Sequence, residues 1–326
     1  MSAVTRVDPA GPAGSTRALS ERRPLGDRGF QVLALASGLL VLVILILIAI
    51  STTQQSSSWF STEGVKVFSS TWNPAANQFG ALAFIYGTAV TAVIAIIIAV
   101  PVSVGVALLL TEVVPYRWSR PIVYVIDLLA VVPSVVWGLW GIIVFAPWIG
   151  RIYGHIGSGV NGVPVLGSLF GPPTSGASFF TAGIILAFMI TPIVTSLSRE
   201  VIATVPTIDK EGAYALGATR LEMIRGAVWP HSQGGVVGAV LLGVGRAMGE
   251  TIAAALVIGS SATITSHLFA PGYNMPAVIA NEFGEASGVF RAALMGMGVL
   301  LFIFTIIINV IARGVVERSA RRKRGA

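Results

Sequence analysis

Two charged residues stand inside an apolar stretch of the sequence, GVGRAMGETIAAALVIG, from Gly243 to Gly259. Arg246 and Glu250 are four residues apart, so a continuous helix would place both side chains on one face, one turn apart. Arginine presents a planar fork of donors that suits a tetrahedral oxyanion, and a nearby carboxylate can orient that fork and weaken its hold. Transport requires release as well as capture. The pair is therefore a candidate for a substrate pathway.

A stripe of glycines accompanies this pair. Its members, two pairs with GxxxG spacing, are Gly234, Gly238, Gly245 and Gly249. GxxxG spacing is typical of helices that pack closely in membranes. Arg246 and Glu250 project about 100° away from the stripe. We expect the glycines to lie against the helix bundle and the charges to face an interior path. The alternative is an internally neutralised pair that only fixes the rotation of the helix.

The composition predicts a membrane protein. Of 326 residues, 54% are hydrophobic and 11% are charged, against about 25% charged in soluble proteins. Six apolar runs are near or above the roughly 20 residues that span a bilayer. They are Gln31 to Ile50, Ala81 to Leu110, Ile122 to Pro147, Phe179 to Leu197, Gly235 to Gly259 and Ala292 to Ile311. A central arginine costs about 2.5 to 3.5 kcal/mol in lipid, so Arg246 must face the protein interior.

The distribution of charge predicts the orientation of the chain. Seventeen of the 21 Lys and Arg residues lie on one side of the six runs, among them a cluster that begins at Arg313. By the positive-inside rule this side, with both termini, is cytoplasmic. We expect a disordered leader over 1–29, a six-span domain over 30–313 and a basic tail over 314–326. The net charge of +7 then serves orientation and contact with anionic lipid, and not nucleic-acid binding.

The residue types exclude several kinds of chemistry. The chain has no cysteine, and its three histidines are far apart in sequence, so we expect no metal site and no catalytic site. It also lacks the GxxxxGK[ST] loop that cradles nucleotide phosphates, which leaves ATP to another polypeptide. Asp127 fits a solvated position near the cytoplasmic interface better than a pathway role, and the role of Arg199 stays open.

Among the segments that connect the runs, two outer loops and one cytoplasmic segment carry the most information. The loop from Arg151 to Ser178 shows no helical period, whereas MPAVIANEFGEA, in the loop from Ser260 to Phe290, predicts a short amphipathic helix. We favour a docking role for these two loops over a passive one. The cytoplasmic segment predicts one amphipathic helix over about 207–221, capped by Thr207. Periodicity alone favours an ordinary interfacial helix packed on the bundle.

The cytoplasmic segment resembles the EAA loop of ABC importer permeases, whose pattern is EAAxxxG followed, after nine residues, by IxLP. The matching positions are Glu211, Gly212, Ala213, Gly217 and Pro230. The resemblance implies a coupling helix that sits in a groove of a separate ATPase subunit. Gly212 replaces one alanine of the pattern, Ala227 its isoleucine and Trp229 its leucine, which puts the individual groove contacts in doubt.

A wider resemblance covers about residues 81 to 313. The motifs GRAMGETIAAALVIG, VPSVVWGLWGIIVFAP, TPIVTSLSREVIATVP and VIANEFGEA are similar to those of the PstC-type permeases of bacterial phosphate importers. This implies the type I ABC importer permease (MetI-like) fold in the bacterial cell membrane, and import of inorganic phosphate by alternating access. Arg246 and Glu250 match the charged residues of the phosphate pathway in that family.

The same resemblance implies partners and leaves alternatives. The partners would be a PstA-type permease in a heterodimer, a pair of PstB-type ATPases that hold ATP and magnesium, and an external PstS-type phosphate-binding protein. No cofactor is expected on this chain. A permease for sulfate or another oxyanion would share this architecture. A secondary transporter or channel would need no coupling helix, and a role in sensing phosphate could share one complex with transport.

Overall fold

The computed structural model describes residues 25–160, 162–171 and 175–324. The chain divides at Ile50 into two units, each of which is described by itself. Residues 1–24, and with them most of the predicted leader, lie outside the described residues.

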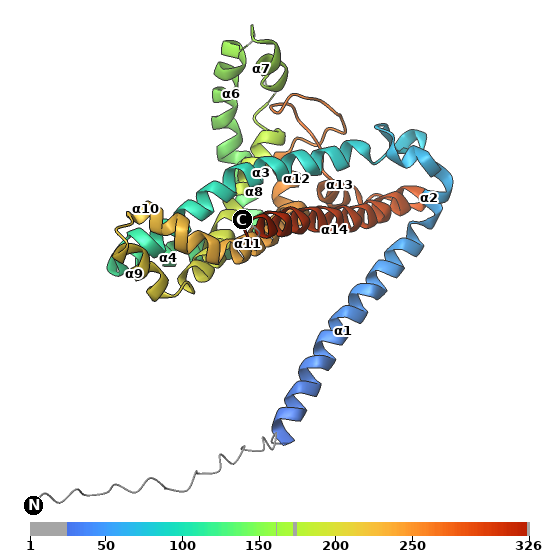
Figure 1. Cartoon of the computed structure of the whole chain (residues 1–326). Coiled ribbons are helices and arrows are strands. Elements are labelled where there is room, and N and C mark those ends of the chain that lie inside the picture. The colour runs from blue at the N-terminus through green and yellow to red at the C-terminus, as the bar shows by residue number, and fades with distance from the viewer. Residues whose placement is uncertain (1–24, 161, 172–174, 325–326) are drawn as a thin grey trace, which may run out of the picture. The chain divides into compact units, whose positions relative to one another are not determined.

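The first unit consists of most of α1 (Leu25–Gln55), the helix nearest the N-terminus in Figure 1. Its 31 residues make it about 46 Å long, more than the hydrocarbon core of about 30 Å requires. No side chain from Gly29 to Ile50 is buried, and Gly29–Gln55 is long and apolar enough to cross a membrane. The first predicted span is therefore a helix, and its apolar side chains are available to lipid.

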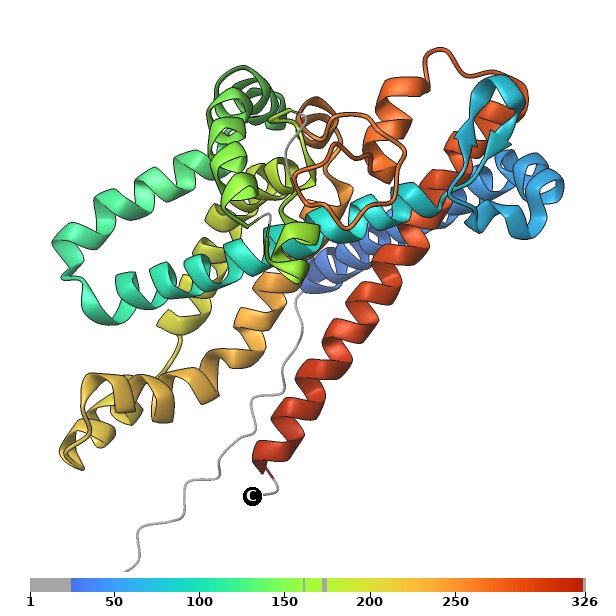
Figure 2. The ribbon, with the colours of Figure 1, turned by 90° about the horizontal axis from the view of Figure 1, so that it is seen from above.

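The second unit is helical except for one short hairpin among its described residues (Figures 1 and 2). In chain order its elements are α2 (Ser57–Glu63), η1 (Gly64–Phe68), β1 (Trp72–Asn73), η2 (Pro74–Ala76), β2 (Gln78–Phe79), α3 (Leu82–Leu108), η3 (Leu109–Val113), α4 (Tyr116–Val131), α5 (Ser134–Trp140), η4 (Gly141–Phe145), α6 (Ala146–Val160), α7 (Pro164–Leu169), α8 (Phe179–Ala203), α9 (Thr207–Ala215), α10 (Arg220–Met223), η5 (Ile224–Val228), α11 (Trp229–Gly249), α12 (Ile252–Val257), α13 (Met275–Glu282) and α14 (Gly288–Arg324). Segments η1 and η2 are 3₁₀ helices, and η3, η4 and η5 are π-helical turns.

Helices α3 and α8 lie side by side and form the centre of this unit (Figures 1 and 2). They approach closely because Gly183 has no side chain: a Cβ atom there would stand 2.4 Å from the Cγ2 atom of Ile94. Inside this contact, the Ser103 hydroxyl donates a hydrogen bond to the carbonyl of Thr191 at 3.1 Å. Helix α11 packs against α8 and also contacts α3. Small residues and satisfied hydroxyls are what helix contacts in membranes require.

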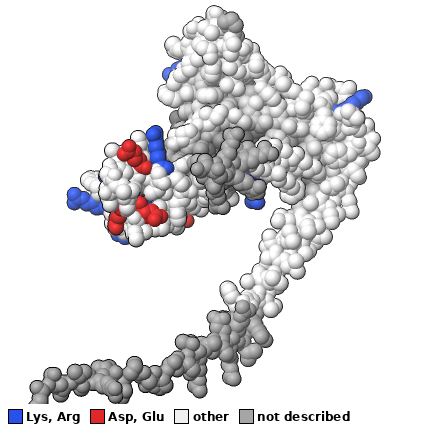
Figure 3. Space-filling view, viewed as in Figure 1, with Lys and Arg blue, Asp and Glu red and all other residues white. Residues whose placement is uncertain are grey.

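Charged side chains are unevenly distributed over the unit. Figure 3 shows acidic and basic side chains gathered at the end formed by α4, α9 and α10, next to a largely uncharged surface. We call the end formed by α9 and α10 the coupling end.

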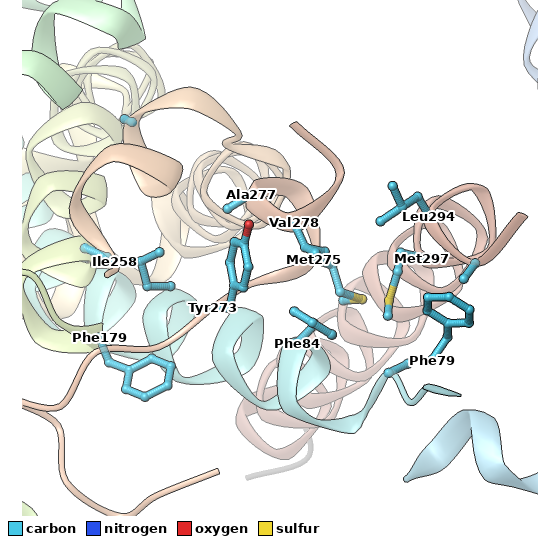
Figure 4. Packing of buried hydrophobic residues seen from close by; sticks show 14 of the residues in the cluster. Phe79, Phe84, Phe179, Ile258, Tyr273, Met275, Ala277, Val278, Leu294 and Met297 are labelled. Atoms are coloured by element: carbon cyan, nitrogen blue, oxygen red, sulfur yellow. The ribbon is translucent and has the colours of Figure 1, made fainter. Parts of the chain in front are cut away.

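The main hydrophobic cluster, part of which Figure 4 shows, includes residues of the hairpin, α13 and the start of α14, which lie away from α9 and α10 (Figures 1 and 2). Phe79 of the hairpin, Phe84 of α3 and Tyr273 meet Met275 of α13 and Met297 of α14 there. The hairpin pairs Trp72 with Phe79, and the Trp72 ring makes edge contacts with Phe79 and Phe84. Apolar burial thus ties together segments that are more than 200 residues apart in the sequence.

One contact in this cluster fixes the start of α14. Trp59 of α2 is fully buried, and its indole nitrogen donates to the carbonyl of Phe79 at 3.0 Å. Its ring lies directly on Gly296, where a Cβ atom would come within 2.1 Å of it. Only glycine admits the ring at this position.

Five helices of the described chain are long and apolar enough to cross a membrane. They are Gly29–Gln55, Leu82–Val113, Ser134–Val160, Phe179–Ala203 and Gly288–Gly314. The all-helical membrane architecture predicted from the sequence is therefore confirmed. We expected the third and the fifth apolar run to form one continuous helix each. In the structure, both runs are broken.

The third run breaks at Val132 and Pro133, which adopt extended backbone angles between α4 and α5. Proline lacks an N–H and disfavours helical angles at the residue before it. The span is Ser134–Val160, where α5 continues through η4 into α6, so the predicted bounds Ile122 to Pro147 are wrong. The expectation of a non-helical loop over 151–178 is also wrong, because it contains the rest of α6 and all of α7. The short helix predicted in MPAVIANEFGEA is confirmed as α13.

Candidate functional site

The fifth apolar run is broken beside the two charged residues that it contains. Helix α11 ends at Gly249, and Glu250 has extended backbone angles (φ −69°, ψ 123°) before α12 begins at Ile252. Glycine has a low helix propensity and commonly ends helices. The Glu250 Oε1 atom instead accepts a hydrogen bond from the backbone N–H of Ala253 at 3.4 Å, in the first turn of α12. The prediction that Arg246 and Glu250 stack on one helix face is therefore wrong.

No ion pair joins Arg246 to Glu250. Within the described ranges the one ion pair links Lys210 to Glu112. Arg246 is exposed in the last turn of α11, and Glu250 is half-buried. The alternative of an internally neutralised pair that sets the rotation of α11 is thus excluded.

Arg246 faces a hollow of about 890 Å³ between α8, α11 and α14. Six residues of the lining matter here: Gly234, Gly238, Gly245 and Arg246 from α11, and Asn309 and Arg313 from α14. Glu250, Asp127 and Arg199 are not part of the lining. The structure therefore brings Arg246 together with α14, and not with the acidic residue that the sequence pairs with it.

The predicted glycine stripe lies on the open side of α11. A Cβ atom added at Gly234, Gly238, Gly245 or Gly249 would meet nothing within 4 Å. The expectation that these glycines lie against the bundle of this chain is wrong. Gly234, Gly238 and Gly245 line the hollow together with Arg246, whereas Gly249 is not part of the lining.

A second set of small residues makes the close contact with α8. A Cβ atom at Gly235 would stand 2.4 Å from Val201, and one at Gly243 would stand 2.6 Å from Val194. Ala239 and Ala247 continue this face at the same four-residue spacing and are buried. The helix carries two stripes of small residues, and the sequence does not say which one meets the bundle.

The segment predicted as one helix over 207–221 is two helices. Helix α9 ends at Ala215, and Gly217 has φ +83°, a left-handed angle that side chains with a Cβ rarely adopt. Helix α10 then starts at Arg220. The predicted capping role of Thr207 is also wrong, because Pro206 holds the N-cap position. The sequence places Gly217 inside a helix, but its backbone angle makes it the turn.

A capping box starts α10. Thr219 accepts from the N–H of Glu222, and the Glu222 carboxylate accepts from both the N–H and the hydroxyl of Thr219, each at 2.7 Å. These bonds to the charged form lower the pKa of Glu222, which is fully exposed. The turn at Gly217 is thus held between two helix ends of defined geometry.

The coupling end presents apolar side chains to solvent. Ile208 is 74% exposed and Leu216 is 91% exposed, and Glu211 and Gly212 lie on the same exposed segment. Ala213 is half-buried against a cluster that includes Met223, and Pro230 occupies the first turn of α11. An exposed apolar surface of this kind on a folded segment is typical of a docking site.

An ion pair that the sequence does not predict holds α9 to the end of α3. The Lys210 Nζ atom lies 2.6 Å from the Glu112 Oε1 atom, and the side chains are 19% and 5% exposed. Glu112 belongs to η3, which follows α3 directly. The signal in the sequence is an acidic residue at the end of a long apolar run, a position that requires a partner. Lys210 supplies that partner across 98 residues.

Residues 99–325 match the model of the family described as the binding-protein-dependent transport system inner membrane component. The chain belongs to this family. It is a multi-pass membrane protein and a permease subunit, and the resemblance found in the sequence is confirmed.

Curated relatives of the permease cover nearly its whole length. It is 44% identical over 300 residues to the phosphate transport system permease protein PstC of Xylella fastidiosa (strain Temecula1), covering 91% of this chain and 92% of that one. It is 42% identical to the protein of the same description from Mesorhizobium japonicum, with 99% of both chains covered. A solved chain of the MetNI methionine ABC transporter in inward-facing conformations is similar with a TM-score of 0.50. That match has 14% identity and covers 73% of the permease and 94% of that chain, which shows the fold alone.

Proposed function

We propose that the permease forms half of the translocation pathway of an ATP-driven importer of inorganic phosphate. The single observation that supports this most is the exposed Arg246 on the wall of the hollow between α8, α11 and α14. The PstC relatives, which are phosphate transport permeases by description, supply the identity of the anion.

The chemistry of Arg246 suits phosphate. The guanidinium group is always charged and can donate two parallel hydrogen bonds to two oxygens of one phosphate. No acidic residue of the described chain forms an ion pair with it. A fixed cation beside low-dielectric walls attracts an anion more strongly than one in bulk water.

The glycines that line the hollow favour movement of an anion along it over tight binding at one place. Gly234, Gly238 and Gly245 leave open space where side chains would stand, so an anion can pass along the backbone of α11. A hollow of about 890 Å³ greatly exceeds the roughly 30 Å³ that one water occupies in the liquid. Phosphate can therefore move through the hollow with its hydration water. It need not lose this water or bind tightly at one place.

The coupling end suits contact with an ATPase on another chain. The exposed Ile208 and Leu216, with Glu211 and Gly212 between them, offer an apolar and acidic docking surface. We place this end in the cytoplasm, with both termini, because 17 of the 21 basic residues fall on its side. The Lys210–Glu112 pair then transmits movement of α9 to α3.

The complete importer contains further subunits in this proposal. A PstA-type permease completes the pathway, two PstB-type ATPases bind ATP and magnesium, and a PstS-type protein delivers phosphate from outside. The hairpin β1–β2 and helix α13 lie away from the coupling end (Figures 1 and 2), and the external protein would dock there.

Uptake of radiolabelled phosphate tests the proposal in cells whose one high-affinity importer contains this permease. We expect Arg246→Gln to lower uptake at least about tenfold, since hydrogen bonds to charged groups contribute about 1.5 to 3 kcal/mol. Arg117→Gln, which removes an exposed arginine outside the hollow, is the matched control and should transport normally. The amount of each variant in the membrane is measured in parallel.

Three outcomes would contradict parts of the proposal. Normal uptake by a well-expressed Arg246→Gln variant would remove Arg246 from the pathway. Competition by excess sulfate would make the permease a carrier of another oxyanion. Uptake that persists without the ATPase subunits would make it a secondary transporter or channel.

A further inference from the structure

Helix α14 brings two polar side chains into the hollow that Arg246 lines. Asn309 and Arg313 are four residues apart on this helix, on one face and one turn apart. The charge pattern of the sequence accounts for Arg313 only as one of the basic residues that set orientation. The position of Arg313 in the lining of the hollow indicates a second role for this residue.

The two arginines lie at different depths of the hollow. The lining extends along α11 from Gly234 to Arg246, a distance of about 18 Å. Helices α11 and α14 run in opposite directions (Figure 2) and pack together in a cluster that holds Val240 and Val244 of α11 and Ile308 of α14. Arg313 lies beyond Ile308 toward the start of α11. Arg246 is therefore at the deep end of the hollow, and Arg313 is nearer the coupling end.

The described lining of the hollow carries positive charge alone. Arg246 and Arg313 are its charged members, and neither aspartate nor glutamate contributes to it. The Asn309 amide adds two N–H donors one turn above Arg313. Two cations and a donor group along one wall form a sequence of attractive positions for an anion that carries several oxygen acceptors.

We propose that Asn309 and Arg313 form a second phosphate-binding position, the last contact of the anion with this chain before the cytoplasm. The inference rests on the proposed function, and it names residues that neither the sequence motifs nor the family resemblance assigns. Phosphate passes from Arg246 to Arg313, and the Asn309 amide donates to it as it leaves.

The physical advantage of a second position lies in release. A single deep cation that binds phosphate strongly enough to receive it also slows its departure. Conduction requires binding sites that are weak or multiple enough to let the ion leave. A second cation nearer the exit lowers the free energy of the anion one step away from Arg246, so that departure proceeds in two smaller steps.

Transport kinetics give the first test, in the whole importer in cells. We expect Arg313→Gln to lower the maximal rate of phosphate uptake about tenfold and to leave the apparent KM unchanged, because the external binding protein sets capture. Arg313→Lys, which keeps the charge, should retain most of the maximal rate. The maximal rate of Asn309→Ala should lie between those of Arg313→Gln and Arg313→Lys. Arg117→Gln controls for the loss of one basic residue from the same side of the membrane.

Thiol labelling gives a second test that does not depend on transport. The chain has no cysteine, so Asn309→Cys creates a single reactive thiol on it. In inside-out vesicles that contain the whole importer, a negatively charged methanethiosulfonate should label this thiol. Inorganic phosphate should slow the labelling several-fold, whereas chloride at equal ionic strength should not. The protection should persist in an Arg246→Gln background and be lost in an Arg313→Gln background.

The outcomes separate this inference from the proposed function. If wild type and control transport phosphate, Arg246→Gln fails and Arg313→Gln keeps the full rate, the second position is overturned and the proposed function stands. Equal loss in Arg313→Gln and Arg313→Lys, without protection of the thiol, also overturns it. If the importer takes up no phosphate but phosphate still protects the thiol, the proposed function fails and the anion position remains.

Discussion

At the scale of single residues, Glu282 has an environment unlike that of the other described acids. It ends α13, and its Oε2 atom accepts a hydrogen bond from the Trp72 indole N–H at 3.1 Å. Burial disfavours the charged carboxylate and raises the pKa of Glu282, although hydrogen bonds from Trp72 and Tyr273 oppose this in part. Glu282 thus couples the hairpin to α13 in a way that depends on its protonation.

The raised pKa gives a pH dependence with a definite sign. Between the ordinary glutamate value and the raised one, the folded state binds more protons than the unfolded state, so stability falls as pH rises through this window. We expect the melting temperature of the detergent-purified wild type to decrease above pH 4.5. Glu282→Gln keeps an acceptor for Trp72 without a charge, and its melting temperature should fall less over the same range. Equal slopes for the two proteins would contradict this account.

Arg246 and Glu250 show how far residue spacing can predict a site. The cost of a charge in lipid predicts that Arg246 needs a polar environment. The structure places it, exposed, on the wall of the hollow. The i, i+4 relation to Glu250 holds only if the helix continues, and it ends at Gly249. Asn309 and Arg313 also have i, i+4 spacing, but only the tertiary fold brings them to Arg246.

At the scale of elements, the Lys210–Glu112 pair joins the coupling end to a central helix. Removing one partner of a largely buried ion pair leaves the other charge uncompensated, which is destabilising. Here the pair connects α9 with the end of α3, so its loss should disconnect the two elements. In the proposed importer the pair would therefore affect how ATP hydrolysis is coupled to transport more than how phosphate is bound.

We expect Glu112→Gln to lower the number of phosphate ions imported per ATP hydrolysed several-fold. Lys210→Gln should lower this number to a similar extent. The double exchange Glu112→Lys with Lys210→Glu should restore much of the ratio of phosphate imported to ATP hydrolysed. Asp209→Asn, on the same exposed helix, is the control. Uptake and ATP hydrolysis by the reconstituted importer measure the ratio. A double exchange no better than either single variant would argue against a direct pair.

The sequence predicts the elements well where helices are long and uninterrupted. α8 begins at Phe179 as its apolar run predicts, because the Ser178 side chain caps the helix by accepting a hydrogen bond from the N–H of Thr181. The failures fall at Pro133, Gly217 and Gly249, where a single residue ends a helix inside an apolar or periodic stretch. Pro192 nevertheless lies within the continuous α8. Local residue type alone does not decide such positions, since neighbouring helices can supply what the proline removes.

At the scale of the whole permease, charge and apolar exposure separate its two ends. The basic residues predict which end faces the cytoplasm, and the exposed apolar residues of α9 and α10 form the surface on which we propose that the ATPase docks. The sequence predicts the docking segment through its motif, but not its shape. The turn at Gly217 is what leaves Leu216 91% exposed at the tip.

We expect Leu216→Asp to weaken association with the ATPase subunits at least about tenfold, because burying a leucine contributes about 1.5 to 3 kcal/mol and burying an unpaired charge costs more. Co-purification of the ATPase with the tagged permease measures this. Val65→Asp is the matched control, since Val65 is 89% exposed in η1, far from α9 in the chain. Equal loss of the ATPase from both variants, or from neither, would remove α9 and α10 as the docking surface.

The contact between Trp59 and Gly296 holds α14 near its start, so that the helix can tilt about this point. The ring clamps the helix near its start, whereas Arg313 lies about 25 Å further along it, beside an open hollow. A tilt of a few degrees about this fulcrum leaves the clamped end in place and moves the far end by an ångström or two, the scale of helix shifts in switching proteins. If Arg313 lines the exit as proposed, such a tilt would change the width of the exit while the outer end of the helix stays in place.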